Sequence, residues 1–183
     1  MMASLIAKVG APAAALVVGL GGGYTVAPDT APTVAVVPVG DCAQPYDRAK
    51  FFGTVPTKSA REASIKAATN EAGEVIDFYT GLPLDPTRID ADHIYALATS
   101  WPVTCSWTRA QRRSLGVDQL NLRPTELSIN RSKGDQTPSE WSPANRDFAC
   151  RYVLLYLRVA AKWKLPVVET DIEAAESACG VTQ

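Results

Sequence analysis

His93 is the only histidine in this chain of 183 residues, and it stands directly after a carboxylate, Asp92. The unperturbed pKa of imidazole lies near neutrality, so His93 is the natural candidate for general-base chemistry at physiological pH. Two asparagines and a lysine follow further along the chain, at Asn121, Asn130 and Lys133. A single histidine is more often a structural hydrogen-bonding residue, so the case for catalysis rests on the whole set.

The segment that carries His93 is predicted to be a strand over residues 88–97. One set of alternate positions is Ile89, Ala91, His93, Tyr95 and Leu97. Alternation of this kind is typical of a strand with one buried face. Neighbouring residues of a strand point to opposite faces. Asp92 and His93 can therefore hold the same ligand only where the strand bends or ends.

A returning strand and a short helix are predicted to follow. The strand covers residues 119–123 and is interrupted by Pro124. The helix covers residues 127–133 and stops at Gly134, as glycine does at a helix C-terminus. This order of elements places Asn130 on a helix that lies across the hairpin holding His93.

The order of these residues resembles the signature of the HNH (His-Me finger) nucleases. Its parts are Asp92-His93, then Asn121, then the run from Asn130 to Asp135, with Asn121 and Asn130 nine residues apart. The segment 138–143 and a helix predicted over 152–165 narrow the resemblance. They are similar to the branch found in secreted bacterial proteins and in the C-terminal part of GmrSD-type restriction enzymes. The resemblance covers residues 78–165 and implies an α+β fold with a ββα-metal core and additional packed helices.

The resemblance also implies roles for the signature residues. His93 is expected to activate water for attack on a phosphodiester, and Asn121 is expected to orient His93. Asp92 and Asn130 are expected to bind one divalent cation, which stabilises charge on the phosphate. Oxygen ligands suit Mg²⁺, and Mn²⁺ is expected to substitute. Asn130 stands where the family usually has a histidine.

Basic residues near the signature are candidate phosphate contacts. The resemblance implies such a contact for Lys133 or Arg131, although Lys133 could instead complement the dipole of its helix. Arg112 and Arg113 lie on a helix predicted over 108–115, where they either contact a nucleic-acid backbone or face solvent. Residues 86–164 hold twelve Lys or Arg and seven Asp or Glu, although the whole chain has a net charge of −1. A polyanion is expected to dock on this segment.

The N-terminal part is predicted to be separate from the folded domain. Residues 1–27 are poor in charge and read as a signal peptide or a membrane anchor, and their most apolar stretch is short for a membrane span. Residues 28–40 are rich in Pro, Ala and Val and are predicted to be a linker. Residues 41–183 are predicted to form one domain, with the signature core at 86–143 and C-terminal helices at 143–179.

Four widely spaced cysteines, with no Cys-x-x-Cys pair, exclude a paired zinc knuckle and favour two disulfides in an oxidising compartment. Three pairings are possible. We favour Cys150–Cys179, which closes the C-terminal helices, and Cys42–Cys105, which ties the N-terminus to the long loop before residue 118. In a reducing cytosol all four would be buried thiols.

Together these features lead us to expect a secreted or surface-anchored, metal-dependent endonuclease that cleaves DNA with low sequence specificity. Three other outcomes stay open. The substrate could be RNA, with the protein acting as a toxin that needs an immunity partner. The chain could also be a nucleic-acid-binding relative that has lost cleavage. A membrane is a partner only if the N-terminal segment is not cleaved.

Overall fold

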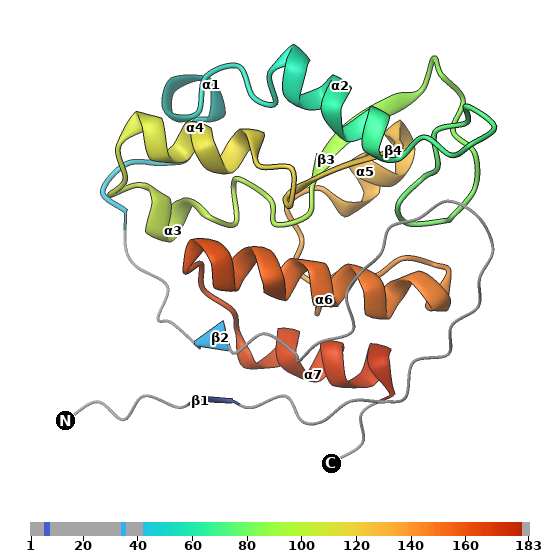
Figure 1. Cartoon of the computed structure of the whole chain (residues 1–183). Coiled ribbons are helices and arrows are strands. Elements are labelled where there is room, and N and C mark those ends of the chain that lie inside the picture. The colour runs from blue at the N-terminus through green and yellow to red at the C-terminus, as the bar shows by residue number, and fades with distance from the viewer. Residues whose placement is uncertain (1–5, 8–33, 36–41, 181–183) are drawn as a thin grey trace.

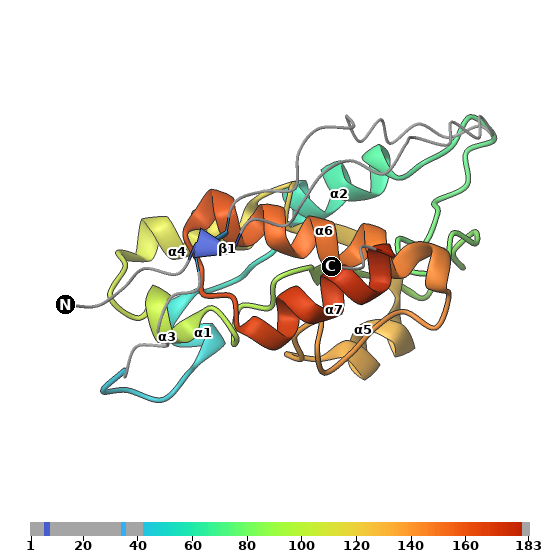
Figure 2. The same cartoon turned by 90° about the horizontal axis from the view of Figure 1, so that it is seen from below.

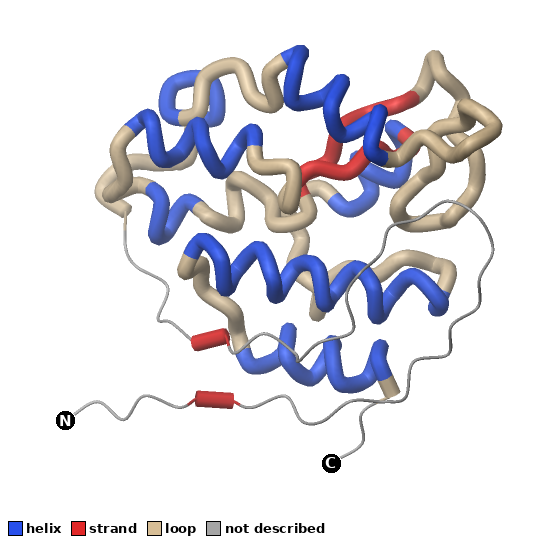
Figure 3. Tube along the Cα trace, viewed as in Figure 1, coloured by secondary structure: helices blue, strands red, loops and turns tan. Residues whose placement is uncertain are grey.

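The computed structural model describes residues 6–7, 34–35 and 42–180. In this part of the chain the fold is α+β, as predicted, with helices predominating over short strands (Figure 3). Ile6–Ala7 (β1) pairs antiparallel with Val34–Ala35 (β2). The segments 1–27 and 28–40 otherwise lie outside the described residues, so their assignments stay predictions. Among the described helices, none has the length and apolar character needed to cross a membrane.

The hairpin of β3 and β4 carries His93. β3 spans Ile89–His93 and pairs antiparallel with β4, Leu122–Glu126, so that His93 stands opposite Leu122. β3 therefore ends at His93, four residues before the end of the strand predicted over 88–97. Helix α5, Leu127–Lys133, follows β4 directly, contacts both strands and ends at Gly134, where φ is 57°. The predicted helix is confirmed at both ends.

The returning strand begins three residues later than predicted and continues through Pro124, which was expected to interrupt it. Proline lacks the N–H that a ladder needs, but each strand of a two-stranded sheet has one edge that makes no ladder bond. Pro124 stands opposite Ala91 in the register, and its carbonyl accepts the backbone N–H of Phe78 at 3.3 Å. The proline is thus accommodated inside β4.

Helix α6, Arg146–Trp163, forms the centre of the core. Figure 1 shows it between the layer that contains the hairpin and the last helix, α7, Glu169–Cys179. Figure 2 shows α7 alongside α6 from below. The ring of Tyr156 on α6 stacks on that of Tyr95, just after β3, with centroids 4.6 Å apart. The other fully buried side chains of α6 include Tyr152, Val153, Leu157 and Val159.

Four further helices precede or connect the hairpin strands: α1 (Arg48–Phe51), α2 (Lys58–Ala67), α3 (Trp101–Thr104) and α4 (Arg109–Val117). Helix α4 begins with a capping box, in which Thr108 and Gln111 satisfy each other's backbone N–H groups. The last turn of α4 reaches the end of β3, where Gly116 contacts His93.

Both favoured disulfides are present. Cys42 and Cys105 join the start of the folded domain to the end of α3, with sulfur atoms 2.02 Å apart. Cys150 and Cys179 join α6 to the last residue of α7, with sulfur atoms 2.09 Å apart. Two disulfides fit an extracellular protein.

Candidate functional site

His93 is held by the C-terminal end of α4. Its Nε2 lies 2.9 Å from the carbonyl oxygen of Gly116. The last four carbonyls of a helix lack intrahelical partners, so this oxygen is free to accept. A carbonyl cannot donate, so Nε2 carries the hydrogen and Nδ1 keeps its lone pair in the neutral ring. Among the described residues Nδ1 has no hydrogen-bond partner, and it is not one of the fully buried, unpaired atoms.

Close approach at Gly116 is what allows this contact. A Cβ atom at Gly116 would lie 2.8 Å from Cγ2 of Val55, closer than real side-chain contacts come. Only glycine lets the last turn of α4 pack on Val55 and bring its carbonyl to His93 in this position. The glycine therefore positions the histidine through the backbone.

Burial lowers the pKa of His93 from 6.5 to about 4, and the hydrogen bond to Gly116 partly opposes this shift. Desolvation disfavours the charged imidazolium, whereas a helix C-terminus favours it. The ring is consequently neutral at physiological pH. A neutral imidazole with a free Nδ1 is in the state required of a general base.

The opposite face of β3 meets α5 through two aspartates. Asn130 donates from Nδ2 to Oδ2 of Asp90 at 2.9 Å, and both residues are half-buried. Lys133 lies 3.2 Å from Oδ1 of Asp92. The structure therefore brings Asn130 to Asp90, not to the Asp92 carboxylate that the resemblance pairs with it. Asp90 and Asp92 nevertheless share one face of the strand.

Asp92 and Lys133 belong to a buried network. Lys133 is 0% exposed and Asp92 is 4% exposed. Asp92 accepts hydrogen bonds from Lys133 and, through Oδ2, from the hydroxyl of Tyr79. Burial raises the pKa of Asp92, and the ammonium of Lys133 opposes that rise. Burial beside Asp92 raises the pKa of Tyr79, which keeps the phenol protonated as a donor.

Lys133 also donates to the backbone carbonyl of His93 at 2.9 Å. We expected Lys133 at a phosphate, but the structure directs its ammonium inward, where no phosphate has access. Its hydrogen bonds fix the end of β3 from the α5 side, while Gly116 fixes the imidazole from the α4 side. Lys133 is thus a positioning residue in this geometry.

Asn121 is fully buried and holds the chain immediately after His93. Its side-chain oxygen accepts the N–H of Tyr95 at 2.8 Å, and its Nδ2 donates to the carbonyl of Tyr95 at 3.1 Å. The carbonyl of Asn121 accepts the N–H of Ile94 at 2.9 Å. The amide was expected to orient the imidazole; in the structure it acts two residues away, through the backbone.

The three candidate arginines divide into one buried and two exposed residues. Arg112 is 9% exposed and donates to the carbonyls of Phe51 and Thr104, each at 3.0 Å. Arg112 therefore ties α4 to the segments before it and does not face a ligand. Arg113 and Arg131 are exposed, so both remain available as phosphate contacts.

This division predicts different results for two neighbouring arginines. Arg112→Ala removes a buried cation from several carbonyls, so we expect it to lower the free energy of unfolding by about 2–4 kcal/mol. Arg113→Ala should leave that free energy within about 0.5 kcal/mol of wild type. If Arg113 contacts a phosphate, its loss flattens the salt dependence of binding by a slope of about 1. Urea titrations measure the two free energies of unfolding, and binding at several salt concentrations measures the salt slope. Equal losses of stability in the two variants would contradict a buried Arg112 and an exposed Arg113.

Two residues of the candidate site, Tyr79 and Asp77, were not predicted from the sequence. Tyr79 lies thirteen residues before Asp92, and no local pattern points from one to the other. Asp77 is buried and accepts hydrogen bonds from Thr125 and Glu126 of β4. A carboxylate in an apolar stretch before a turn was the only available signal for Asp77.

The oxygen donors at the hairpin suit a hard divalent cation, since carboxylate and amide oxygens are its preferred ligands. Asp90 and Asn130 are within hydrogen-bond distance and half-buried, so they fit a cation best. Asp92 lies on the same face with both oxygens bonded. In the part of the chain that the structure describes, no three or more His, Cys, Asp or Glu side chains form a metal-binding cluster.

Comparison with known proteins gives no independent guide: no family model, no curated protein and no solved structure matches this chain.

Proposed function

We propose that this protein is a metal-dependent HNH endonuclease that hydrolyses phosphodiester bonds, and that β3, β4 and α5 are its ββα-metal unit. The observation that carries the proposal is the setting of His93. Its Nε2–H is bonded to a helix-terminal carbonyl, its Nδ1 is free, and the other face of its strand presents oxygen donors beside Asn130. The resemblance of the ordered signature residues supports the same activity.

The chemistry assigned to His93 is removal of a proton from water. As the water oxygen forms a bond to phosphorus, Nδ1 takes the proton, and the bond from phosphorus to the leaving oxygen breaks. The leaving oxygen keeps the electron pair of that bond and takes a proton from solvent. The imidazolium that results is stabilised by the Gly116 carbonyl and the negative end of the α4 dipole. It returns its proton to solvent. Lys133 and Asn121 hold the backbone at His93 and at Tyr95, respectively, while this step takes place.

A divalent cation, Mg²⁺ first and Mn²⁺ second, would supply charge stabilisation at the phosphate and the leaving oxygen when bound. Asn130 is proposed as one ligand. The second is a carboxylate of β3: Asp92, as the resemblance implies, or Asp90, which lies against Asn130 in the structure. A nucleic acid is the proposed substrate, with DNA favoured over RNA.

A nicking assay on the oxidised protein tests the activity. Supercoiled plasmid is expected to be nicked with Mg²⁺ or Mn²⁺ and left intact with EDTA, with an RNA substrate tested in parallel. RNA cleavage without DNA cleavage would replace the favoured substrate and support the toxin alternative. Failure to cleave either polymer with either metal, by protein shown to be folded, would support a non-catalytic role instead.

The same assay separates the two candidate carboxylates. Asp90→Asn and Asp92→Asn keep side-chain size and remove the charge. The variant that lacks the true ligand is expected to need at least about tenfold more Mg²⁺ for half-maximal nicking. The other variant should show the wild-type Mg²⁺ dependence. Equal behaviour of both variants and wild type would exclude a cation held by this face of β3.

A further inference from the structure

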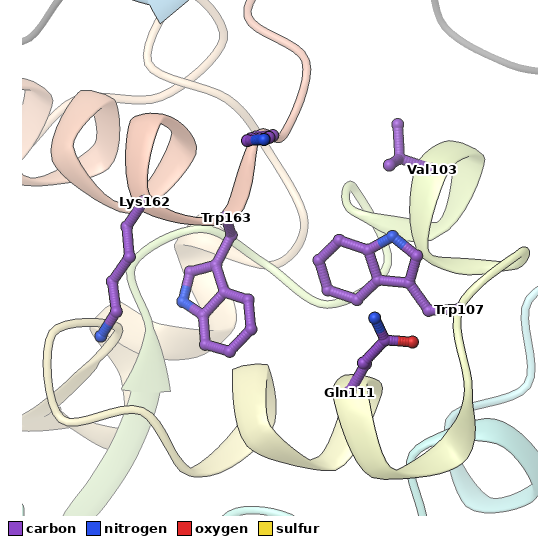
Figure 4. Close-up of a pocket in the computed structure, with 6 residues that line it drawn as sticks. Val103, Trp107, Gln111, Lys162 and Trp163 are labelled. Atoms are coloured by element: carbon purple, nitrogen blue, oxygen red, sulfur yellow. The ribbon is translucent and has the colours of Figure 1, made fainter.

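A hollow of about 340 Å³ opens beside α4. It is formed by the end of α3, the first turn of α4 and the end of α6 (Figure 4). We call it the tryptophan hollow, and its lining residues are Val103, Trp107, Gln111, Lys162, Trp163 and Lys164.

Two indole rings dominate the tryptophan hollow. The centroids of Trp107 and Trp163 are 5.9 Å apart, with the rings tilted by 36°. A flat ligand between two rings needs them about 7 Å apart, or two van der Waals contacts, so nothing inserts between these two. Trp163 is flanked on its other side by the ammonium of Lys162, 5.6 Å from the ring centroid. Among the described residues Trp163 is the only ring partner of Trp107. Trp107 packs against the core and is half-buried, and its remaining exposed part lines the tryptophan hollow.

The polar groups of Trp163 and Lys162 are already used. Nε1 of Trp163 donates to Oδ2 of Asp118 at 2.6 Å, and Nζ of Lys162 lies 2.7 Å from the same oxygen. These contacts fix the wall of the tryptophan hollow to the residue that caps α4 at its C-terminus. The wall is therefore pre-organised.

The groups left free are all donors or cations. Oε1 of Gln111 accepts from the N–H and the hydroxyl of Thr108, at 2.9 and 2.8 Å, which fixes its amide. Figure 4 shows that amide directed toward the two indole rings. Within the described residues, Nε2 of Gln111, Nε1 of Trp107 and the exposed ammonium of Lys164 have no acceptor. A ligand that fits must bring a flat ring, hydrogen-bond acceptors and negative charge.

We infer that the tryptophan hollow binds an unpaired nucleobase together with its neighbouring phosphate, so that the protein engages single-stranded stretches of its substrate. The base stacks on the part of the Trp107 ring that lines the hollow, its acceptor atoms meet Gln111, and the phosphate meets Lys164. Stacking on aromatic side chains is the usual basis of single-strand binding, and it is closed to bases inside a duplex. This inference rests on the proposed function, since it names the substrate class of the same protein.

The position of the hollow relates it to the candidate active site. Gln111 lies in the first turn of α4 and Gly116, the acceptor of His93, in the last. Five residues of helix span roughly 7.5 Å along the axis. One short rigid helix therefore carries a wall of the tryptophan hollow at one end and orients the general base at the other.

Direct binding in EDTA, where no cleavage is expected, tests the inference. One probe is a fluorescently labelled single strand of ten thymidines. The other is a labelled blunt-ended DNA hairpin whose loop is a non-nucleotide linker, so that it contains no unpaired base. Trp107→Leu is expected to weaken single-strand binding about tenfold and to leave hairpin binding unchanged. Gln111→Glu keeps the acceptor that caps α4 but replaces the free donor by a charge, and is expected to weaken single-strand binding to a similar extent.

Lys66→Ala, at an exposed lysine on α2, is the matched control for Lys164→Ala. Only the Lys164 variant should lower the salt slope for the single strand, by about 0.7. Near-ultraviolet circular dichroism confirms that each variant is folded. If folded Trp107→Leu and Gln111→Glu proteins bind the single strand as tightly as wild type, the inference is wrong. Plasmid nicking by wild type would then still support the nuclease. Equal losses for hairpin and single strand would also overturn it. If wild type neither nicks nor binds, the proposed function falls as well.

Discussion

Replacing His93 with alanine is expected to lower the rate of phosphodiester cleavage by about 10²–10⁴-fold, which is the range that general-base catalysis contributes. The physical reason is that His93 is the only histidine, and its free Nδ1 is the site from which water would lose its proton. Metal-dependent nicking under single-turnover conditions measures the effect. His93→Gln, which keeps a polar side chain without a base at this pH, should be equally inactive.

The pH dependence of the wild-type rate gives a second check on His93. Burial lowers the pKa of His93 to about 4, so Nδ1 is unprotonated throughout the neutral range. As the pH falls toward 4 the ring gains a proton, the base is lost, and the rate should fall with it. Above about pH 5 this group should impose no further change. A rate that halves near pH 6.5 would show an imidazole in contact with bulk water, contrary to the buried geometry. Full nicking by folded His93→Ala protein would remove His93 from the mechanism.

Lys133→Met is expected to lower the free energy of unfolding by about 3–5 kcal/mol, because it leaves Asp92 buried without its cation. It also removes the donor to the His93 carbonyl, so the rate should fall in the fraction that remains folded. Urea denaturation measures the first effect and nicking the second. Asp92→Asn combined with Lys133→Met should regain part of the stability, since no unpaired charge is then buried.

Arg131→Met is the matched control for Lys133→Met, since Arg131 is exposed on the same helix two residues away. It should change stability by no more than about 0.5 kcal/mol. If Arg131 contacts a phosphate, its loss raises KM at unchanged stability. The same pattern for Lys133→Met would show that its ammonium reaches the substrate after all, as the resemblance implied, and would contradict the buried network.

The hairpin, its helix and the disulfides were predictable because their signals are local or few in number. Alternation marks β3, Gly134 marks the end of α5, and four cysteines allow only three pairings. The end of β4 was not predictable, because the tolerance of Pro124 depends on which edge of the sheet it faces.

In the candidate site, too, the features that depend on local sequence were predictable and those that depend on long-range packing were not. That Asp92 and His93 point apart follows from strand geometry, and the structure places them on opposite faces. That Lys133 turns inward could not be inferred, because a lysine at a helix end is usually solvated and only the partner Asp92, forty-one residues earlier, draws it in. The pairing of Asn130 with Asp90 similarly depends on how α5 is set against β3. Long-range packing decides both.

The two disulfides close separate loops, of 63 and 29 residues in sequence separation. In the chain-entropy description, loops of these lengths restrict the unfolded chain by about 4.3 and 3.6 kcal/mol. Because the loops do not overlap, the effects add to about 8 kcal/mol, which is comparable with the roughly 5–15 kcal/mol of whole-domain stabilities. Full reduction is therefore expected to remove a large part of the free energy of unfolding, so that any activity which needs the fold would depend on oxidised thiols.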